Sequence, residues 1–140
     1  MSLKRNVLDL RKRKEIVLQG GGEEAIKKQA AMGKLTARER IEAILDKDSF
    51  HEYDMFVEHQ SKDFDMDKKV LHGDGVIIGT GTIYGEPVCI YAQDFTVAGG
   101  SLGLMHARKI TKIMDHALKM RVPLSGINDC GGARIQEGIN

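Results

Sequence analysis

A strand–helix–strand pattern in the second half of the chain does most to limit its fold. Residues 75–83 and 88–92 are β-branched runs on either side of a short turn, residues 84–87, which contains Gly and Pro. Two such runs are typical of a β-hairpin. A helix is predicted over residues 101–120, and the apolar run 122–127 after it indicates a further strand. A strand, a helix and a strand in this order form a right-handed parallel crossover, so the sequence predicts an α/β fold.

The helix predicted over residues 101–120 has two different faces. Its N-cap is expected at Ser101, and a buried face is indicated by apolar residues at helical spacing: Ile110, Ile113, Met114, Ala117 and Leu118. The opposite, solvated side is expected to carry four charged residues: Lys109, Lys112, Asp115 and Lys119. His106 and His116 are ten positions apart, too far to share a metal ion, and are interpreted as surface histidines.

Residues 1–48 are predicted to form a helical arm. A first helix is expected over residues 7–18 and should end at three consecutive glycines. A second helix is expected over residues 23–32. Thr36 and Glu39 match the capping box, in which each side chain accepts a hydrogen bond from a free N–H at the helix start. The helix that they begin presents three apolar residues on one face: Ile41, Ile44 and Leu45. We expect these helices to pack on another part of the protein.

Residues 49–140 are expected to form the α/β part of the chain. Within this part, residues 50–56 alternate weakly and indicate a strand, whereas residues 60–69 are charged, lack periodicity and are expected to form a loop.

The composition is that of a globular protein with reduced thiols. The 140 residues are 41% hydrophobic and 29% charged, and no apolar run approaches the roughly 20 residues that span a bilayer. No signal peptide is recognised. Cys89 and Cys130 lack the spacing of a metal site or a disulfide framework. A cytoplasmic location, or an organelle matrix, is therefore expected.

Charge is distributed unevenly along the chain. Residues 1–40 hold 11 Lys and Arg against 5 Asp and Glu, a net charge of +6, whereas residues 41–140 hold 10 against 15, a net charge of −5. A basic segment of this kind attracts nucleic acid or a phosphorylated small molecule, or simply forms a solvated helix surface. No aromatic residue occurs in the first 40 positions, so base stacking, and with it nucleic-acid binding, is disfavoured.

The segment 127–138, INDCGGARIQEG, follows the last predicted strand and is the first candidate for chemistry. The adjacent glycines of Gly131-Gly132-Ala133 allow the backbone to approach a ligand closely, with N–H groups directed into a concavity. Such groups stabilise a negative oxygen that develops during a reaction. A tight turn without function remains the alternative.

Other residues are further candidates for a functional role, each with an argument against it. Gly99 and Gly100 could present N–H groups to an anion at a helix start, although they match neither usual nucleotide-binding motif. Arg134 could bind phosphate or pair with Glu137 three residues later. Cys130 has no identified His or Asp partner, which disfavours a nucleophilic role.

Four blocks occur in order along the sequence: GKLTARER at 33–40, GDGV at 73–76, AQDFTV with GGSLG at 92–103, and NDCGGARIQEG at 128–138. Together they resemble the carboxyltransferase (beta) subunit of biotin-dependent acyl-CoA carboxylases of the propionyl-CoA and methylmalonyl-CoA type. The resemblance extends from about residue 7 and corresponds to the N-terminal part of such a subunit. It implies the start of a crotonase-like domain over residues 49–140, preceded by the helical arm.

The resemblance also implies a mechanism. Such subunits move a carboxyl group between N1 of carboxybiotin and the α-carbon of an acyl-CoA through a thioester enolate. Backbone N–H groups of Gly131, Gly132 and Ala133 would supply one half of the oxyanion site, and a later segment of the family's sequence supplies the other. Arg134, Gly99, Gly100, Lys34 and Arg38 are candidate substrate contacts, and no metal site is expected. Cys130 departs from the family, which usually has Ser there.

The expected partners follow from the same resemblance. They are acyl-CoA, a biotin carboxyl carrier and a biotin carboxylase subunit, with homo-oligomers of the full-length subunit, and biotin is carried on a separate domain or subunit. The 140-residue chain alone is expected to be inactive. Two alternatives remain: a methylmalonyl-CoA decarboxylase subunit of a sodium-pumping complex, and a non-catalytic CoA-binding or assembly module.

Overall fold

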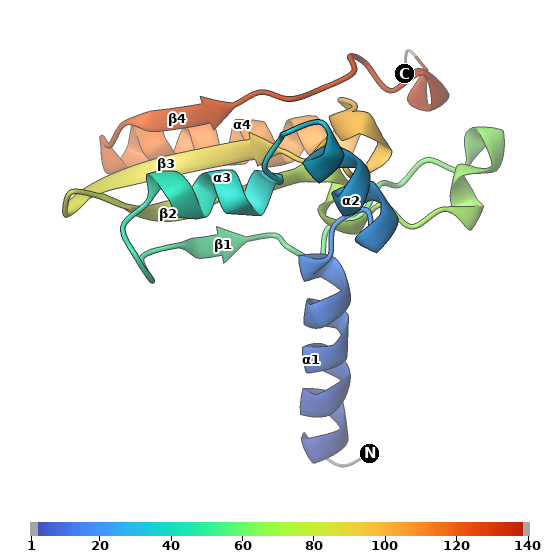
Figure 1. Cartoon of the computed structure of the whole chain (residues 1–140), viewed down its shortest axis with the longest axis horizontal. Helices are drawn as coiled ribbons and strands as arrows, with labels where there is room; N and C mark the ends of the chain where they lie inside the picture. Colours follow the sequence, from blue (N-terminus) through green and yellow to red (C-terminus); the bar gives the residue numbers. More distant parts are fainter. Residues whose placement is uncertain (1–2, 139–140) are drawn as a thin grey trace.

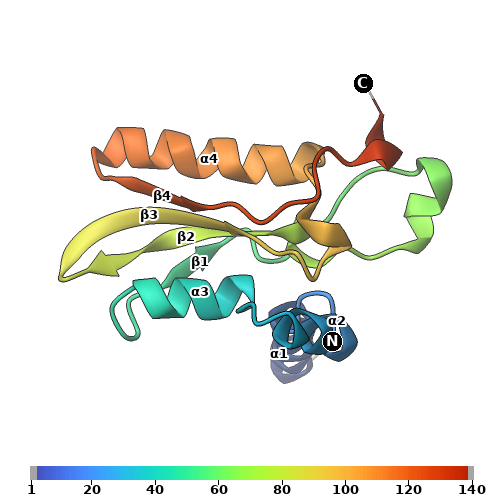
Figure 2. The same cartoon turned by 45° about the horizontal axis from the view of Figure 1, so that its top comes forward.

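The computed structural model describes residues 3–138, which fold into a mixed four-stranded sheet with a helix on each face (Figure 2). The strand order is β1-β2-β3-β4. The strands are β1 (His51–Tyr53), β2 (Val76–Ile83), β3 (Glu86–Gln93) and β4 (Leu124–Ile127). The helices are α1 (Leu3–Leu18), α2 (Glu23–Ala31), α3 (Ala37–Ile44) and α4 (Leu104–Met120). The predicted α/β class is confirmed.

The predicted hairpin is formed by β2 and β3, which pair antiparallel from Val76↔Gln93 to Ile83↔Glu86. Its two turn residues, Tyr84 and Gly85, have φ angles of 50° and 81°. Two consecutive positive φ values are those of a type I′ turn, whose twist matches that of the strands. The side chain of Asp46 accepts hydrogen bonds from both turn N–H groups, at 3.0 and 2.8 Å, and so attaches the hairpin end to the segment after α3.

The predicted crossover joins β3 to β4 through α4. The two strands pair in parallel, from Cys89↔Leu124 to Ala92↔Ile127. Parallel neighbours end at the same edge of a sheet, so the loops that follow β3 and β4 emerge side by side. This edge carries most of the residues that the sequence singled out.

Two apolar clusters, one on each face of the sheet, form the core. Successive side chains of a strand point to opposite faces, so Ile77 of β2 packs with α3 while its neighbours Val76 and Ile78 pack with α4. The cluster under α3 comprises Ala37, Ile41, Leu45, Ile77, Val88, Ile90 and Ala92. The cluster under α4 comprises Val76, Ile78, Cys89, Ile113 and Ala117.

The N-terminal helices form in the predicted segments, but α1 and α3 pack differently. α1 projects away from the sheet (Figure 1). α3, although part of the predicted arm, contributes Ile41 and Leu45 to the sheet core. Ile44 was predicted on the same face, and this is wrong, because the residue is 42% exposed and is not part of the core cluster. Both bonds of the capping box at Thr36 are present.

The remaining segments agree with the predictions in outline. β1 forms within residues 50–56 and pairs antiparallel with β2. The loop predicted at residues 60–69 contains a short 3-10 turn, Asp63–Lys68, which buried Met66 anchors. Within residues 3–138, no helix is long and apolar enough to cross a membrane.

Candidate functional site

Two loops at the carboxyl ends of β3 and β4 pair with each other, and we call them the paired loops: residues 94–103 and 128–134. Gly131 N–H donates to the Gly99 carbonyl at 2.9 Å, and Leu102 N–H donates to the Gly132 carbonyl at 2.9 Å. Leu102 and Ala133 form a parallel bridge. The paired loops therefore bring together Gly99, Gly100 and Gly131–Ala133, which the sequence had placed in separate motifs.

The three N–H groups proposed for an oxyanion are not equivalent. Gly131 N–H is bonded to Gly99, and Gly132 N–H points to the Cys130 sulfur at 3.1 Å. Ala133 N–H has no acceptor within residues 3–138. Ala133 is exposed, and Gly132 before it has a φ of 112°, a conformation that glycine adopts most readily. Ala133 is thus the member of the set whose N–H is open to a ligand oxygen.

Gly100 is required by close packing between the paired loops. Its φ is 61°, and a Cβ at this position would lie 2.4 Å from the carbonyl oxygen of Asp129. Gly99 has a similar φ of 64°, but a Cβ there would meet nothing within 4 Å. Both glycines support the geometry of the loops, and Gly100 also sets how close they lie.

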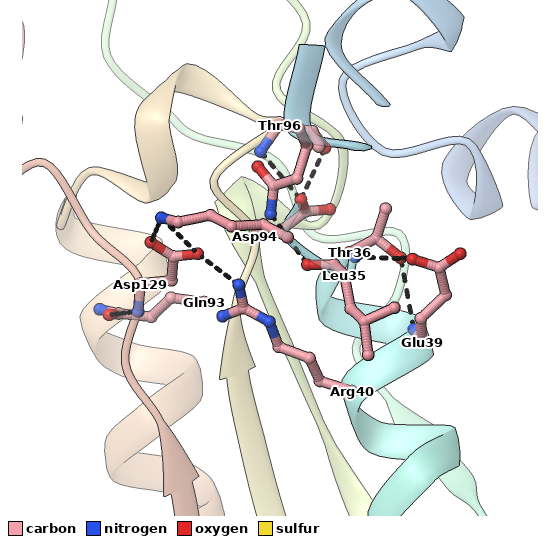
Figure 3. A network of polar contacts seen from close by, with 10 residues as sticks. Leu35, Thr36, Glu39, Arg40, Gln93, Asp94, Thr96 and Asp129 are labelled. Atoms are coloured by element: carbon pink, nitrogen blue, oxygen red, sulfur yellow. Dashed lines mark hydrogen bonds and ion pairs between the residues drawn. The ribbon is translucent and has the colours of Figure 1, made fainter. Parts of the chain in front are cut away.

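Asp129 is held through its side chain and its backbone (Figure 3). Its carboxylate accepts hydrogen bonds from Lys34 Nζ at 3.1 Å and Arg40 Nη2 at 2.8 Å. Its N–H donates to Gln93 Oε1 at 3.1 Å. Partial burial opposes ionisation of this carboxyl, but the bonds from Lys34 and Arg40 outweigh it and hold its pKa below the ordinary value. Asp129 therefore fixes the start of the 128–134 loop against α3 and the segment before it.

The predicted cationic contacts lie in two places. Lys34, besides binding Asp129, stands over the Phe95 ring at 5.2 Å from its centroid, next to the paired loops. Arg38 instead forms a two-bond ion pair with Glu52 of β1, at 2.7 and 3.0 Å. The structure thus does not bring the two cations together, and their contact with substrate remains a prediction.

The start of α4 is capped by carboxylates from distant segments. Ser101 was predicted as its N-cap, and this is wrong, because the helix begins at Leu104 and Gly103 occupies the cap. Leu104 N–H donates to Glu137 at 2.6 Å, and His106 N–H donates to Asp74 at 2.8 Å. These internal anions occupy the positive end of the helix dipole, so the described N–H groups at this helix start do not serve an external anion.

Arg134 is buried between these two carboxylates. Its Nη1 bonds to Asp74 and, at 2.8 Å, to Glu137, while Nε and Nη2 bond to Ser101. The predicted pairing with Glu137 is confirmed. Burial raises the pKa of Asp74, and the Arg134 guanidinium limits that rise. The guanidinium is committed within the protein, so a contact between Arg134 and substrate stays a prediction that the fold does not favour.

Both predicted faces of α4 need correction: Met114 and Leu118, expected to be buried, are 50% and 78% exposed, and the solvated side loses His106 and Lys109. The latter two were expected at the surface, yet their exposed fractions are 0% and 2%. Lys109 Nζ donates to the carbonyls of Gly73 and Val76, and His106 Nδ1 lies 2.9 Å from the Asp74 carbonyl. The Gly73 and Asp74 carbonyls belong to a left-handed turn at residues 73–75, and the Val76 carbonyl follows at the start of β2. Burial lowers the pKa of His106 to about 4 and that of Lys109 to about 8.

The sequence contained a signal for the buried face of α4. The buried residues of α4 are His106, Lys109, Ile113 and Ala117, which follow one another at intervals of three and four residues. This is the spacing of a single helix face. The charges of the first two residues concealed it, because a lysine is rarely buried without partners.

Two clefts of the described structure adjoin α4, one at its start and one along its later turns. One of about 600 Å³ is lined by Ala133, Leu102, Leu104 and residues 60–63. A larger one of about 780 Å³ lies between β1 and α4, beside Tyr53 and His116, and contains none of the predicted site residues. Since the first contains Ala133, it is the better candidate for a ligand. Residues 3–138 contain no cluster of three or more His, Cys, Asp or Glu suited to a metal ion.

Comparisons with known proteins agree with this architecture. The family described as Carboxyl transferase domain matches residues 28–140. The chain is 53% identical over 131 residues to the propionyl-CoA carboxylase beta chain of Cereibacter sphaeroides, covering 94% of this chain and 26% of that protein. It is 55% identical over 124 residues to the methylmalonyl-CoA decarboxylase subunit alpha of Veillonella parvula, covering 89% of this chain and 24% of that protein.

A solved structure shows the same fold. The transcarboxylase 12S hexamer with methylmalonyl-coenzyme A and methylmalonic acid bound superposes with a TM-score of 0.96 at 43% identity, covering 99% of this chain and 27% of that chain. The expected crotonase-like fold is confirmed. The chain spans about a quarter of the length of the relatives it matches. Family match, identity and superposition agree, and the chain belongs to the carboxyl transferase domain family.

Proposed function

We propose that this chain is the thioester-binding portion of a biotin-dependent carboxyltransferase acting on a short acyl-CoA such as propionyl-CoA. The observation that carries the proposal is Ala133, an exposed residue after the carboxyl end of β4 that lines a cleft of about 600 Å³ and whose N–H has no acceptor in residues 3–138. Sites in α/β proteins commonly lie at this edge of the sheet. Within the crotonase-like fold, residues 49–140 would form the first part of the domain, covered by α3.

Ala133 would hold the thioester oxygen as it gains charge. A hydrogen-bond donor fixed before the reaction stabilises the enolate more than the neutral carbonyl, and so lowers the barrier. Gly131 and Gly132 would act differently, because their N–H groups already bond to Gly99 and Cys130. We therefore assign them to the shape of the loop and Ala133 to the contact with substrate.

The predicted cations would serve the substrate unequally. Lys34 is part-exposed beside the paired loops and could reach an anionic group while it remains near Asp129. Arg38 is bound to Glu52 through both terminal nitrogens and is the weaker candidate. A coenzyme A phosphate near Lys34 would form a charge-assisted hydrogen bond.

The proposal gives this chain only the thioester side of the reaction. A separate carrier would present carboxybiotin, whose N1–carboxyl bond would break as the carboxyl group bonds to the α-carbon, and the α-proton would pass to N1 of biotin. No group within residues 3–138 is assigned to biotin. A biotin carboxylase subunit, a carrier and further copies of the full-length subunit would complete the assembly, in a cytoplasmic or matrix setting.

The reverse direction is the second candidate. Identity to the decarboxylase subunit, 55% over 124 residues, is as high as identity to the carboxylase, 53% over 131 residues. The enolate and its N–H donor are common to both directions, so Ala133 would play the same part in each.

The test is an assay of the gene product at its natural length with a biotinylated carrier. Transfer is measured with propionyl-, acetyl- and butyryl-CoA as acceptors, and in the opposite direction from methylmalonyl-CoA. Preferred carboxylation supports the first candidate, and preferred decarboxylation the second. Absence of transfer in either direction would overturn the enzymatic proposal.

We further propose that residues 1–140 alone do not catalyse transfer, since they cover about a quarter of the relatives. Calorimetry with coenzyme A distinguishes a chain that still binds ligand from one that does not. Turnover by the isolated chain would contradict this part. Binding without transfer by the natural-length product would instead favour a non-catalytic CoA-binding module.

A further inference from the structure

A buried chain of hydrogen bonds reaches the candidate site from beneath. His106 Nδ1 lies 2.9 Å from the carbonyl oxygen of Asp74, and its Nε2 lies 3.3 Å from the side-chain nitrogen of Gln93. Gln93 Oε1 then accepts from Asp129 N–H at 3.1 Å. This hydrogen-bond chain joins the turn before β2, helix α4, the end of β3 and the loop that leads to Gly131–Ala133.

The donors and acceptors can be assigned from chemistry. A carbonyl oxygen only accepts, so His106 Nδ1 carries a proton, and in the neutral ring Nε2 is then an acceptor. It accepts from the Gln93 amide group, whose oxygen must consequently face the other way, toward Asp129. If Nε2 were also protonated, it would face the Gln93 NH₂ group as donor against donor. Turning the amide to relieve this contact would present NH₂ to Asp129 N–H instead.

Asp129 connects the hydrogen-bond chain to the loop of residues 128–134, and other contacts limit how far Asp129 can move. Its carbonyl oxygen lies so close to Gly100 that a Cβ there would be 2.4 Å away, and Lys34 and Arg40 hold its carboxylate. Only three residues separate it from Ala133, and Gly131 between them is bonded to Gly99. Among these contacts, the bond to Gln93 is the one that fixes the Asp129 N–H, so we expect its loss to be transmitted along the loop to Ala133 N–H.

We propose that neutral His106 is a positioning residue: by fixing the orientation of the Gln93 amide, it holds Asp129 and with it the loop that presents Ala133 N–H. The loop geometry is a property of this chain, whereas its effect on catalysis rests on the proposed function. His106 would touch no reacting atom.

The surroundings of His106 keep the ring neutral. Burial is the largest effect, and the cations Arg134 and Lys109 add to it, while Asp74 and Glu137 oppose it. Together these hold the pKa of His106 at about 4. At neutral pH the donors and acceptors of the hydrogen-bond chain are thus ordered so that the Gln93 oxygen faces the Asp129 N–H.

The first experiment needs no variant. Long-range ¹H–¹⁵N NMR of the 140-residue chain at pH 7 should show His106 protonated at Nδ1 and unprotonated at Nε2. On acidification, the amide signals of Asp129 and Gly131 should move with the same midpoint as His106. A proton on Nε2 at pH 7, or loop amides that ignore the titration of His106, would overturn the proposal.

Two variants extend the test. His106→Asn keeps a donor for Asp74 but is too short to reach Gln93, so hydrogen exchange at Asp129 and Gly131 should quicken about tenfold. His116→Asn, on the same helix, is the matched control and should leave both amides unchanged. Gln93→Glu places a carboxylate against Nε2, which should raise the midpoint of His106 by one pH unit or more.

Unchanged exchange in a folded His106→Asn variant would contradict the positioning role. If that variant does not fold, the wild-type titration and Gln93→Glu still decide. The NMR readouts do not involve turnover, so they stand or fall independently of the assay for carboxyl transfer. In the natural-length product, His106→Asn should lower kcat more than it raises KM, because the substrate still binds while its oxygen is held less well.

Discussion

Arg134 and Asp74, sixty residues apart in the sequence, form an ion pair whose side chains are 1% and 0% exposed. The same guanidinium nitrogen also contacts Glu137, and both carboxylates cap the start of α4. Through this pair, the loop after β4 is attached to the helix and to the turn before β2.

Removing the cation from this pair should strongly destabilise the protein. Arg134→Met leaves Asp74 buried without its counter-ion, and such changes cost about 3–5 kcal/mol. Urea denaturation measures the free energy of unfolding. Lys68→Met removes one partner of an exposed pair with Asp65, with side chains 71% and 73% exposed, and should change stability by no more than about 0.5 kcal/mol. Equal effects of the two substitutions would show that the buried pair has no special role.

The capping box at the start of α3 should make a measurable local contribution. In Thr36→Ala, the N–H of Glu39 loses its acceptor and the free energy of unfolding should fall by about 1 kcal/mol. Thr111→Ala is the control, because that exposed hydroxyl only bonds back to the Ala107 carbonyl within α4. Its loss should be neutral or slightly stabilising. Thermal unfolding of both variants provides the comparison, and a neutral Thr36→Ala would refute the assignment.

Alanine substitutions at the neighbouring residues Gly99 and Gly100 should distinguish the effect of backbone strain from that of steric contact. Gly99→Ala introduces a methyl group at a φ of 64° in open space and should cost about 1 kcal/mol. Gly100→Ala has nearly the same φ, 61°, but its methyl group would displace the Asp129 carbonyl. It should therefore cost more, and it should perturb the NMR signals of residues 129–133. If both variants behave alike, close packing of the paired loops is not what Gly100 provides.

Stability should fall as the pH is lowered below neutrality. Unfolded His106 gains a proton near its ordinary pKa of 6.5, whereas the folded protein resists until about 4, so the unfolded state binds more protons between these values. Lowering the pH from 7 to 5 should thus reduce the free energy of unfolding by about 2 kcal/mol. Urea titrations at several pH values measure this slope.

The matched histidine variants locate the origin of that slope. His106→Asn should flatten it, and His116→Asn should retain it, because His116 lies at the surface edge beside Tyr53. A slope that survives in His106→Asn would assign the effect to another group.

Helix α3 should behave as part of the domain core rather than as an arm. Ile41 is buried against the sheet, and Ile41→Ala should cost about 2–5 kcal/mol through lost burial and an unfilled cavity. Ile16→Ala, in the exposed face of α1, should cost far less. Chemical denaturation distinguishes the two. A small loss for Ile41→Ala would support the division of the chain at residue 48.

Local sequence determined the elements whose signals depend on near neighbours. The hairpin needed two β-branched runs on either side of a short turn that contains Gly85, and these are adjacent in the chain. The capping box of Thr36 and Glu39 likewise involves residues three positions apart. The order of strand, helix and strand was sufficient for the parallel pairing of β3 and β4. The residue types at 131–133 predicted a tight glycine turn that could bind an anion or a carbonyl, whereas its role in an oxyanion site came from the family resemblance and stays a prediction.

Tertiary structure alone decided which polar groups are buried and which N–H remains open. His106 and Lys109 are buried because a left-handed turn, thirty or more residues earlier, supplies the carbonyls that satisfy them. Glu137 and Asp74 replace Ser101 as caps of α4 because folding brings carboxylates from distant segments to the helix dipole. Ala133 N–H has no acceptor in residues 3–138 because pairing between the two loops uses the N–H groups of Gly131 and Arg134 instead. The physical reason is the same in each case: a local pattern shows which groups need partners, and only packing determines which partners they meet.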